Sequence, residues 1–160
     1  MNMNKIENST TERIIRITGR EPVSCKCALC KSQCRRTPCL GTPQDIWALI
    51  EAGYGDRLAL TAWGVGMMVG KLPFPVPMVQ IVQTPDGCAF FKDGLCQLHD
   101  LGLKPTEGRL SHHSVTAENF DFNRSLSWNV AREWLNEKNA RIIIRIFERF
   151  SVITVRVKIK

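Results

Sequence analysis

The residues best suited to chemistry are cysteines, and five of the seven lie in the segment CKCALCKSQCRRTPC, residues 25–39. Thiolates bind zinc, iron and iron–sulfur clusters, and they also carry out redox reactions. In Cys27-x-x-Cys30, a tight turn would let two sulfurs reach one ion at about 2.3 Å. Because the segment has few large apolar side chains, it cannot fold on a core of its own. We therefore expect a metal to order it.

More ligand-type residues follow far along the chain. Cys88 and Cys96 flank Lys92-Asp93-Gly94, which predicts a tight hairpin that brings the two thiols towards each other. His99 lies three residues after Cys96, a spacing that suits one metal. The sequence thus predicts a cage closed by two distant segments. The candidate ligands are Cys25, Cys27, Cys30, Cys34, Cys39, Cys88, Cys96, His99 and His112.

This candidate set is larger than one site needs. A tetrahedral zinc site takes four ligands, so the set allows one site or two. His112 and His113 are adjacent and would diverge by about 100° on a helix, so at most one of them faces a given site. Four cations interleave with the thiols and would offset thiolate charge, although the same pattern also fits a solvated basic loop. They are Lys26, Lys31, Arg35 and Arg36.

A disulfide framework fits the sequence poorly. Seven is an odd number of cysteines, so they cannot all pair within the chain. The start, MNMNKIENSTTER, has no apolar region of the kind found in signal peptides, which predicts a reducing, cytoplasmic location. Nor does any stretch approach the roughly 20 apolar residues that span a bilayer, so no membrane partner is expected.

The basic charge is concentrated at one end of the chain. The net charge is +7, and residues 141–160 hold six basic residues against one acidic residue. A nucleic-acid-binding domain would be more evenly basic, and no recognition helix follows the CxxC pair. A zinc-dependent nucleic-acid module is therefore allowed but not favoured. The chain has no P-loop, no GxGxxG and no HExxH, so no enzyme class is indicated, and nothing points to a particular protein partner.

The elements that must position the cysteines predict a small α+β domain. We expect a flexible segment over 1–20 and a single metal-stabilised domain over 21–160. Thr42 as N-cap, Pro43 and Asp45 predict the start of a helix that ends at Gly53. The remaining expectations are a short helix over 56–63, extended or irregular structure over 64–78, a strand over 79–83, a short helix over 104–113, a long helix over 125–150 and a strand over 152–160.

Three motifs resemble one known family. They are Cys27-Ala-Leu-Cys30-Lys-Ser-Gln-Cys34, Gly87-Cys-Ala-Phe-Phe-Lys-Asp-Gly-Leu-Cys96 and Lys104-Pro-Thr-Glu-Gly-Arg109. Together, over residues 25–113, they are similar to the YkgJ-type cysteine-cluster proteins, the CxxCxxCC family described as zinc- or iron-chelating domains. The resemblance implies metal chelation through Cys27, Cys30, Cys34, Cys88 and Cys96.

The chain also departs from this family at three positions. The third family cysteine falls on Gln33, the last on Gly108, and a family tyrosine on His99. The candidates to replace the missing ligands are Cys25, Cys39, His99 and one of His112 or His113. The sequence therefore predicts a protein that chelates zinc or iron in a structural or storage role. An iron–sulfur redox protein or oxidoreductase is the alternative, because the same ligands hold both.

Overall fold

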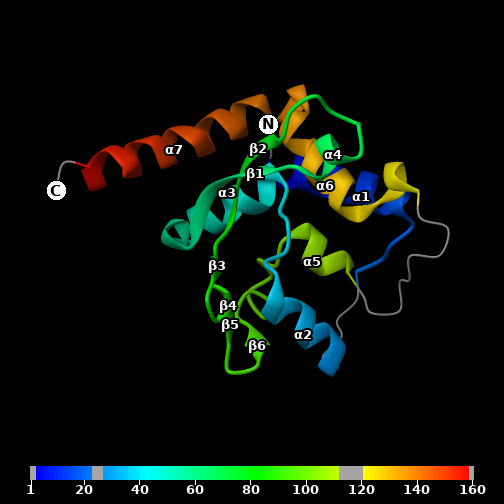
Figure 1. Cartoon of the computed structure of the whole chain (residues 1–160), viewed down its shortest axis with the longest axis horizontal. Helices are drawn as coiled ribbons and strands as arrows, with labels where there is room; N and C mark the ends of the chain where they lie inside the picture. The colour runs from blue at the N-terminus through cyan, green and yellow to red at the C-terminus, as the bar shows by residue number, and fades with distance from the viewer. Residues whose placement is uncertain (1–2, 23–26, 112–120, 159–160) are drawn as a thin grey trace.

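The computed structural model describes residues 3–22, 27–111 and 121–158, and it is a small α+β fold (Figure 1). The helices are α1 (Met3–Thr18), α2 (Ala28–Arg36), α3 (Pro43–Glu51), α4 (Val65–Met68), α5 (Thr106–Leu110), α6 (Leu126–Ala131) and α7 (Ala140–Lys158). Short 3₁₀ turns occupy η1 (Gly55–Arg57), η2 (Phe122–Arg124), η3 (Arg132–Leu135) and η4 (Glu137–Asn139). This confirms the predicted class and the presence of a long C-terminal helix.

Three antiparallel hairpins make up the strands of the described residues. The first pairs β1 (Leu58–Trp63) with β2 (Val76–Ile81), with Leu58 opposite Ile81. The other two are minimal: β3 (Gln83–Thr84) with β4 (Gly87–Cys88), and β5 (Phe91–Lys92) with β6 (Leu95–Cys96). Both small hairpins confirm reversals expected from the sequence, at Pro85-Asp86 and at Asp93-Gly94.

Helix α3 forms as its sequence predicts. The Thr42 hydroxyl accepts from the Asp45 N–H at 3.2 Å, and the Asp45 carboxylate accepts from the Thr42 N–H at 2.9 Å, which completes a capping box. At the other end, Gly53 has φ +91, and the N–H of Tyr54 donates to the carbonyl of Leu49. This left-handed cap ends the helix as expected. Because both ends are fixed, α3 presents a rigid apolar face to the core.

The segment 56–63, where a helix is expected from sequence, is instead the turn η1 followed by strand β1. The reason is its partner: β2 is buried along almost its whole length and supplies the ladder that β1 completes. Tertiary pairing outweighs the local pattern here. Residues 64–78, expected to be extended or irregular and not helical, hold the short helix α4, which contradicts the expectation, and the start of β2, which agrees with it.

The expected long helix over 125–150 is interrupted. Helix α6 is followed by η3 and η4, which flank Asn136, and α7 begins only at Ala140. The buried Asn139 donates to the backbone carbonyl and to the carboxylate of Glu133, both at 2.9 Å, which stabilises the break. The strand expected over 152–160 is helical as far as Lys158. Continuing the helix pairs backbone groups internally, whereas an isolated strand would leave them unpaired.

The N-terminal segment also differs from expectation. Residues 3–18, where flexibility is expected, form helix α1, which packs on α6. Ile14 is fully buried with Leu110, Leu126 and Val130 in a small second core. Arg13 forms an ion pair with Glu133. The apolar contact and the ion pair anchor this helix to the rest of the chain.

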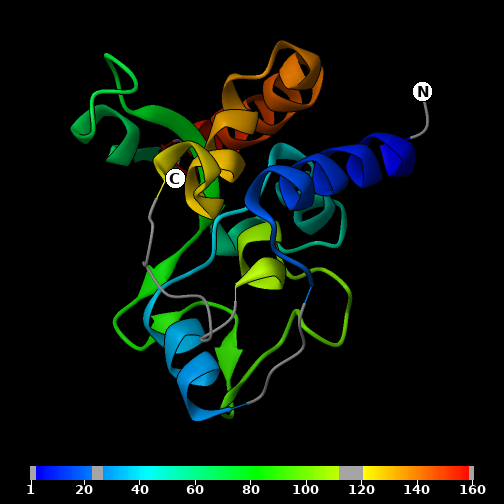
Figure 2. The ribbon, with the colours of Figure 1, turned by 90° about the vertical axis from the view of Figure 1, so that its right-hand side faces the viewer.

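The elements fall into two regions. We call α1, α3, α4, α6, α7, β1 and β2 the helical body, and α2, β3–β6 and α5 the cysteine lobe. Figure 2 shows α2 and the small hairpins at one end of the molecule, with α6 and α7 at the other. Among the described helices, none has the length and apolar character required to cross a membrane.

Candidate metal centre

A cavity of about 380 Å³ lies in the cysteine lobe and gathers most of its cysteines. Its walls come from α2, the segment after α2, strands β4–β6 and helix α5. The predicted ligands among its lining residues are Cys30, Cys34, Cys39, Cys88, Cys96 and His99. Residues from 30–39 and from 88–99 therefore line one cavity, as expected for two segments that close one site.

Close backbone packing positions Cys34 and Cys88. Strand β4 begins at Gly87, which has φ +113, and a Cβ there would overlap the backbone carbonyl oxygen of Arg35. Only glycine permits this conformation and this approach. The Gln83 side chain also donates to the backbone carbonyl of Arg36 at 2.9 Å. The C-terminal end of α2 is thus seated on the β3–β4 hairpin, with Cys34 and Cys88 at the junction.

The β5–β6 hairpin positions Cys96. Its two-residue turn, Asp93-Gly94, has positive φ at both residues, 51° and 77°, as the twist of a tight hairpin requires. Cys96 ends β6 opposite Phe91 and lines the cavity. The turn that the sequence predicts therefore delivers this thiol to the cavity.

Cys39 lies against helix α5. A Cβ built on Gly108 would come within 2.7 Å of the Cys39 sulfur, so the sulfur fills the space that a side chain at 108 would occupy. Glu107 fixes the neighbouring backbone: its carboxylate accepts from the Leu40 N–H at 3.0 Å, and its own N–H donates to the Leu40 carbonyl at 3.1 Å. The glycine at 108 is thus a steric requirement of the cysteine at 39.

The four thiols of Cys34, Cys39, Cys88 and Cys96 influence one another. Burial is the first cause that raises the pKa of Cys39 and of Cys88, and negative charge on Cys96 raises both further. The hydrogen bond that Cys34 donates to Cys96 is the first cause that raises the pKa of Cys34. The same bond, with the N–H groups of Leu98 and His99, lowers the pKa of Cys96 to about 6 despite burial.

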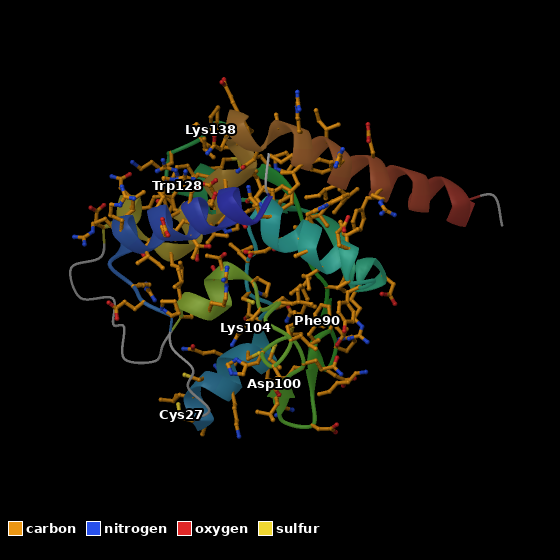
Figure 3. The ribbon with its side chains drawn as sticks, turned by 180° about the vertical axis from the view of Figure 1, so that it is seen from behind. Cys27, Phe90, Asp100, Lys104, Trp128 and Lys138 are labelled. Atoms are coloured by element: carbon orange, nitrogen blue, oxygen red, sulfur yellow. The ribbon has the colours of Figure 1, made fainter. Side chains whose placement is uncertain are left out.

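One cation accompanies all four thiols. The ammonium of Lys104 lowers the pKa of Cys34, Cys39, Cys88 and Cys96 alike. Figure 3 labels Lys104 between α5 and α2. Sequence reasoning assigns the counter-charge to Lys26, Lys31, Arg35 and Arg36 and misses Lys104. Its position just before Pro105, at the start of a helix, carries no signal of nearby thiols.

The chemistry of this donor set fits a thiophilic metal ion, since it combines four thiols with a lysine that favours their ionised forms. In the described residues, however, no three Cys, His, Asp or Glu side chains are already arranged to hold an ion. The thiols share a cavity. Side-chain rotations would be needed to form a coordination sphere.

The other predicted ligands are placed differently. Cys27 is the N-cap of α2, where its sulfur accepts from the Cys30 N–H at 3.4 Å, and it is not among the residues that line the cavity. Figure 3 labels it at the outer end of α2, away from Lys104. Cys25, His112 and His113 lie outside the described residues. Their predicted roles stay predictions.

No family model matches this chain, and no curated protein or solved structure is significantly similar to it.

Proposed function

We propose that the protein binds a thiophilic metal ion, zinc or iron, through Cys34, Cys39, Cys88 and Cys96. The observation that carries this proposal is the gathering of four thiols from α2, the segment after it, β4 and β6 around one cavity. Negative charge on Cys96 raises the pKa of the other three thiols, and the ammonium of Lys104 lowers the pKa of all four. Tetrahedral thiolate coordination is the chemistry that such a set supports best.

Because these thiols are buried, a bound metal ion is a better occupant of the cavity than a set of thiolates without a cation. Burial raises the pKa of Cys39 and Cys88, so neither ionises readily without a partner. A bound cation supplies the opposite charge and displaces the thiol protons. Metal affinity would then increase with pH as the thiols give up their protons.

A structural role fits this site better than transient storage. The metal would tie α2, none of whose nine residues is buried, to β4 and β6, which are two residues long each. Metal ligation contributes folding free energy directly in such regions. Cys30 and His99 line the same cavity and would be available as further ligands.

The proposal also accommodates a departure from the family that the sequence resembles. In that family a cysteine is expected at position 108, where this chain has glycine. Here the sulfur of Cys39 occupies the space beside the Gly108 backbone. Cys39 would therefore supply, from another segment, the thiol that position 108 lacks.

Elemental analysis of protein purified without added metal tests the proposal. We expect stoichiometric zinc or iron in the wild type and its loss in Cys34→Ser, Cys39→Ser, Cys88→Ser and Cys96→Ser. Cys27→Ser is the matched control, because serine is a preferred N-cap and would keep the cap of α2. A visible absorption band would identify an iron–sulfur cluster. Equal metal content in Cys39→Ser and the wild type would refute this ligand set.

A further inference from the structure

The outer edge of strand β1 carries backbone groups that face away from β2. The N–H of Val82 donates to the carbonyl of Arg57 at 3.0 Å, and the register of the ladder places these two residues opposite one another. Because hydrogen-bonded and non-hydrogen-bonded pairs alternate in an antiparallel ladder, Leu60 and Ala62 turn their N–H and C=O groups outward. In the part of the chain that the structure describes, these outward groups have no backbone partner.

This edge is exposed and almost free of charge. Residues 59–62 are all exposed, and Leu60 keeps 54% of its surface in contact with solvent. Between Arg57 and Asp86 the chain has one charged residue, Lys71. Edge strands are ordinarily protected from pairing by charged side chains, by proline or by a covering element. Strand β1 has neither a charged residue nor a proline, so its edge is open to another strand.

Helix α4 continues the apolar surface beyond the end of β1. A Cβ built on its buried Gly66 would meet the rings of Trp63 and Trp128 at 3.1 and 3.3 Å, so the helix is packed closely on both tryptophans. The same packing leaves Met67 and Met68 exposed, at 43% and 82%. Figure 2 shows α4 and the loop after it projecting from the helical body at the upper left.

We propose that β1 pairs antiparallel with β1 of a second copy of this chain, which gives a symmetric dimer with a four-stranded sheet. A two-fold axis makes the pairing reciprocal, so the outward groups of Leu60 and Ala62 in one copy bind the outward groups of the other. The strand order of the joined sheet is β2–β1–β1–β2. The interface lies in the helical body and goes beyond the proposed metal centre.

Charge favours a second copy as the occupant of this edge. The chain carries a net charge of +7, so two copies repel one another unless they meet through a surface of low charge. Strand β1 and helix α4 offer such a surface, since neither holds a charged residue. A negatively charged lipid surface would instead attract a basic cluster. The one cation in residues 58–85, all of them described, is Lys71, whose ammonium donates to Asn123 at 2.6 Å.

Sheet stability supports the same occupant. A two-stranded hairpin is marginal by itself, and three or more strands with an apolar face are more stable. One side of the β1–β2 hairpin is already covered, because β2 is buried over most of its length and packs on η3. A second β1 would cover the other side.

Sedimentation equilibrium of the full chain over a concentration series tests the dimer. We expect a monomer–dimer equilibrium, and Leu60→Lys should raise its Kd about tenfold or more because pairing brings two like charges to one edge. Leu101→Lys is the matched control, since Leu101 is 55% exposed but lies in the cysteine lobe, and it should leave Kd unchanged. A monomer at every concentration, or equal effects of the two variants, would overturn the inference.

Two further comparisons test the symmetry and the place of the interface. Leu60→Lys and Leu60→Glu should each be monomeric alone, and their mixture should regain the dimer because opposite charges then share one edge. No recovery on mixing would rule out a two-fold β1 pairing. Met68→Lys should weaken the dimer less than Leu60→Lys, since Met68 lies beyond the strand. A larger effect of Met68→Lys would move the interface to α4 and overturn the strand pairing.

Amide hydrogen exchange, followed by NMR at low and high protein concentration, tests the backbone pairing directly. The N–H groups of Leu60 and Ala62 should exchange more slowly in the dimer, whereas those of Ala59 and Thr61, which face β2, should change little. Uniform slowing along β1 would indicate side-chain packing without strand pairing. Slowing that requires vesicles of anionic lipid, and not a higher protein concentration, would identify a lipid contact. Either result would overturn the inference.

Discussion

The helical body and the cysteine lobe are stabilised by different means. In the body, Ile46 and Leu49 of α3, Val76 and Met78 of β2, and Ile146 of α7 are fully buried. In the lobe, none of the nine residues of α2, all of which the structure describes, is buried. Apolar burial of order 25 cal/mol per Å² stabilises the body. In the lobe it extends to Phe90, Leu98 and Leu110, but α2 is held by close backbone contacts instead.

Polar groups show the same contrast. Asp45, buried in the body, accepts hydrogen bonds from the N–H groups of Thr42 and Thr106 and forms an ion pair with Arg109. This carboxylate is fully used in joining α3 to α5. The thiols of the lobe face a cavity, and negative charge on Cys96 raises the pKa of Cys34, Cys39 and Cys88, which is an arrangement that a cation would relieve. The carboxylate of Asp45 is therefore satisfied within the fold, whereas the thiols are suited to a ligand.

The largest expected effect comes from truncating the body. Leu49 is fully buried in α3, so Leu49→Ala should lower the free energy of unfolding by about 2–5 kcal/mol. Because the change lies outside the cysteine lobe, the loss should be the same with and without zinc. Urea denaturation followed by circular dichroism measures it. A loss that zinc fully restores would contradict the separation of the two regions.

The second prediction tests the contact between the C-terminal end of α2 and strand β4. In Gly87→Ala, the new Cβ would overlap the Arg35 carbonyl, and alanine would be strained at φ +113. We expect a loss of about 3 kcal/mol or more, together with weaker metal binding. Gly102→Ala is the matched control, since Gly102 also has positive φ, +67, but a Cβ there meets no atom within 4 Å. Equal losses in the two variants would show that backbone strain alone is responsible.

The sequence predicts the local geometry of these regions better than their long-range pairing. The cap of α3 and the reversal at Asp93-Gly94 follow from residues within a few positions of one another, and both are confirmed. Strand β1, expected to be helical, depends on β2, whose register no local pattern specifies. The break at Asn136 depends on the buried Glu133–Asn139 contact, which is equally invisible in an apolar periodicity.

The same distinction holds for the candidate site. Spacing alone predicts that the two cysteine segments meet, and residues from both line one cavity. It does not reveal that the Cys39 sulfur lies against Gly108 or that Lys104 acts on four thiols, because both depend on where α5 packs. Spacing also does not show that Cys27 is an N-cap outside the cavity lining while Cys34, seven residues later, lines the cavity.

Zinc should stabilise the lobe by mass action. At a free zinc concentration of about 100 Kd, the free energy of unfolding should rise by about 2.7 kcal/mol in the wild type. Cys39→Ser should show no such increase, while Leu49→Ala should keep it, because its change lies in the body. Thermal unfolding with zinc and with a chelator measures the difference. An equal increase in Cys39→Ser would show that zinc binds elsewhere.

The reactivity of Cys96 should report the hydrogen bond within the lobe. Its pKa is lowered to about 6 in the folded state, so the thiolate contributes stability that is fully present above the ordinary cysteine pKa and is lost as the pH falls through about 6. Alkylation of Cys96 in metal-free protein should therefore reach half its maximal rate near pH 6. Cys34→Ala removes the first cause of the lowered pKa and should shift this midpoint upward. An unchanged midpoint would contradict the contact.

The smallest effect tests the hairpin that carries Cys96. Gly94 has φ +77, and a Cβ there meets no atom within 4 Å, so Gly94→Ala changes backbone strain and nothing else. We expect a loss of about 1 kcal/mol in urea denaturation. The strain lies in the turn and not at the sulfur, so zinc affinity should change less than in Gly87→Ala. If Gly94→Ala instead abolished zinc binding, the hairpin turn rather than the seating of α2 would control the geometry of the thiols.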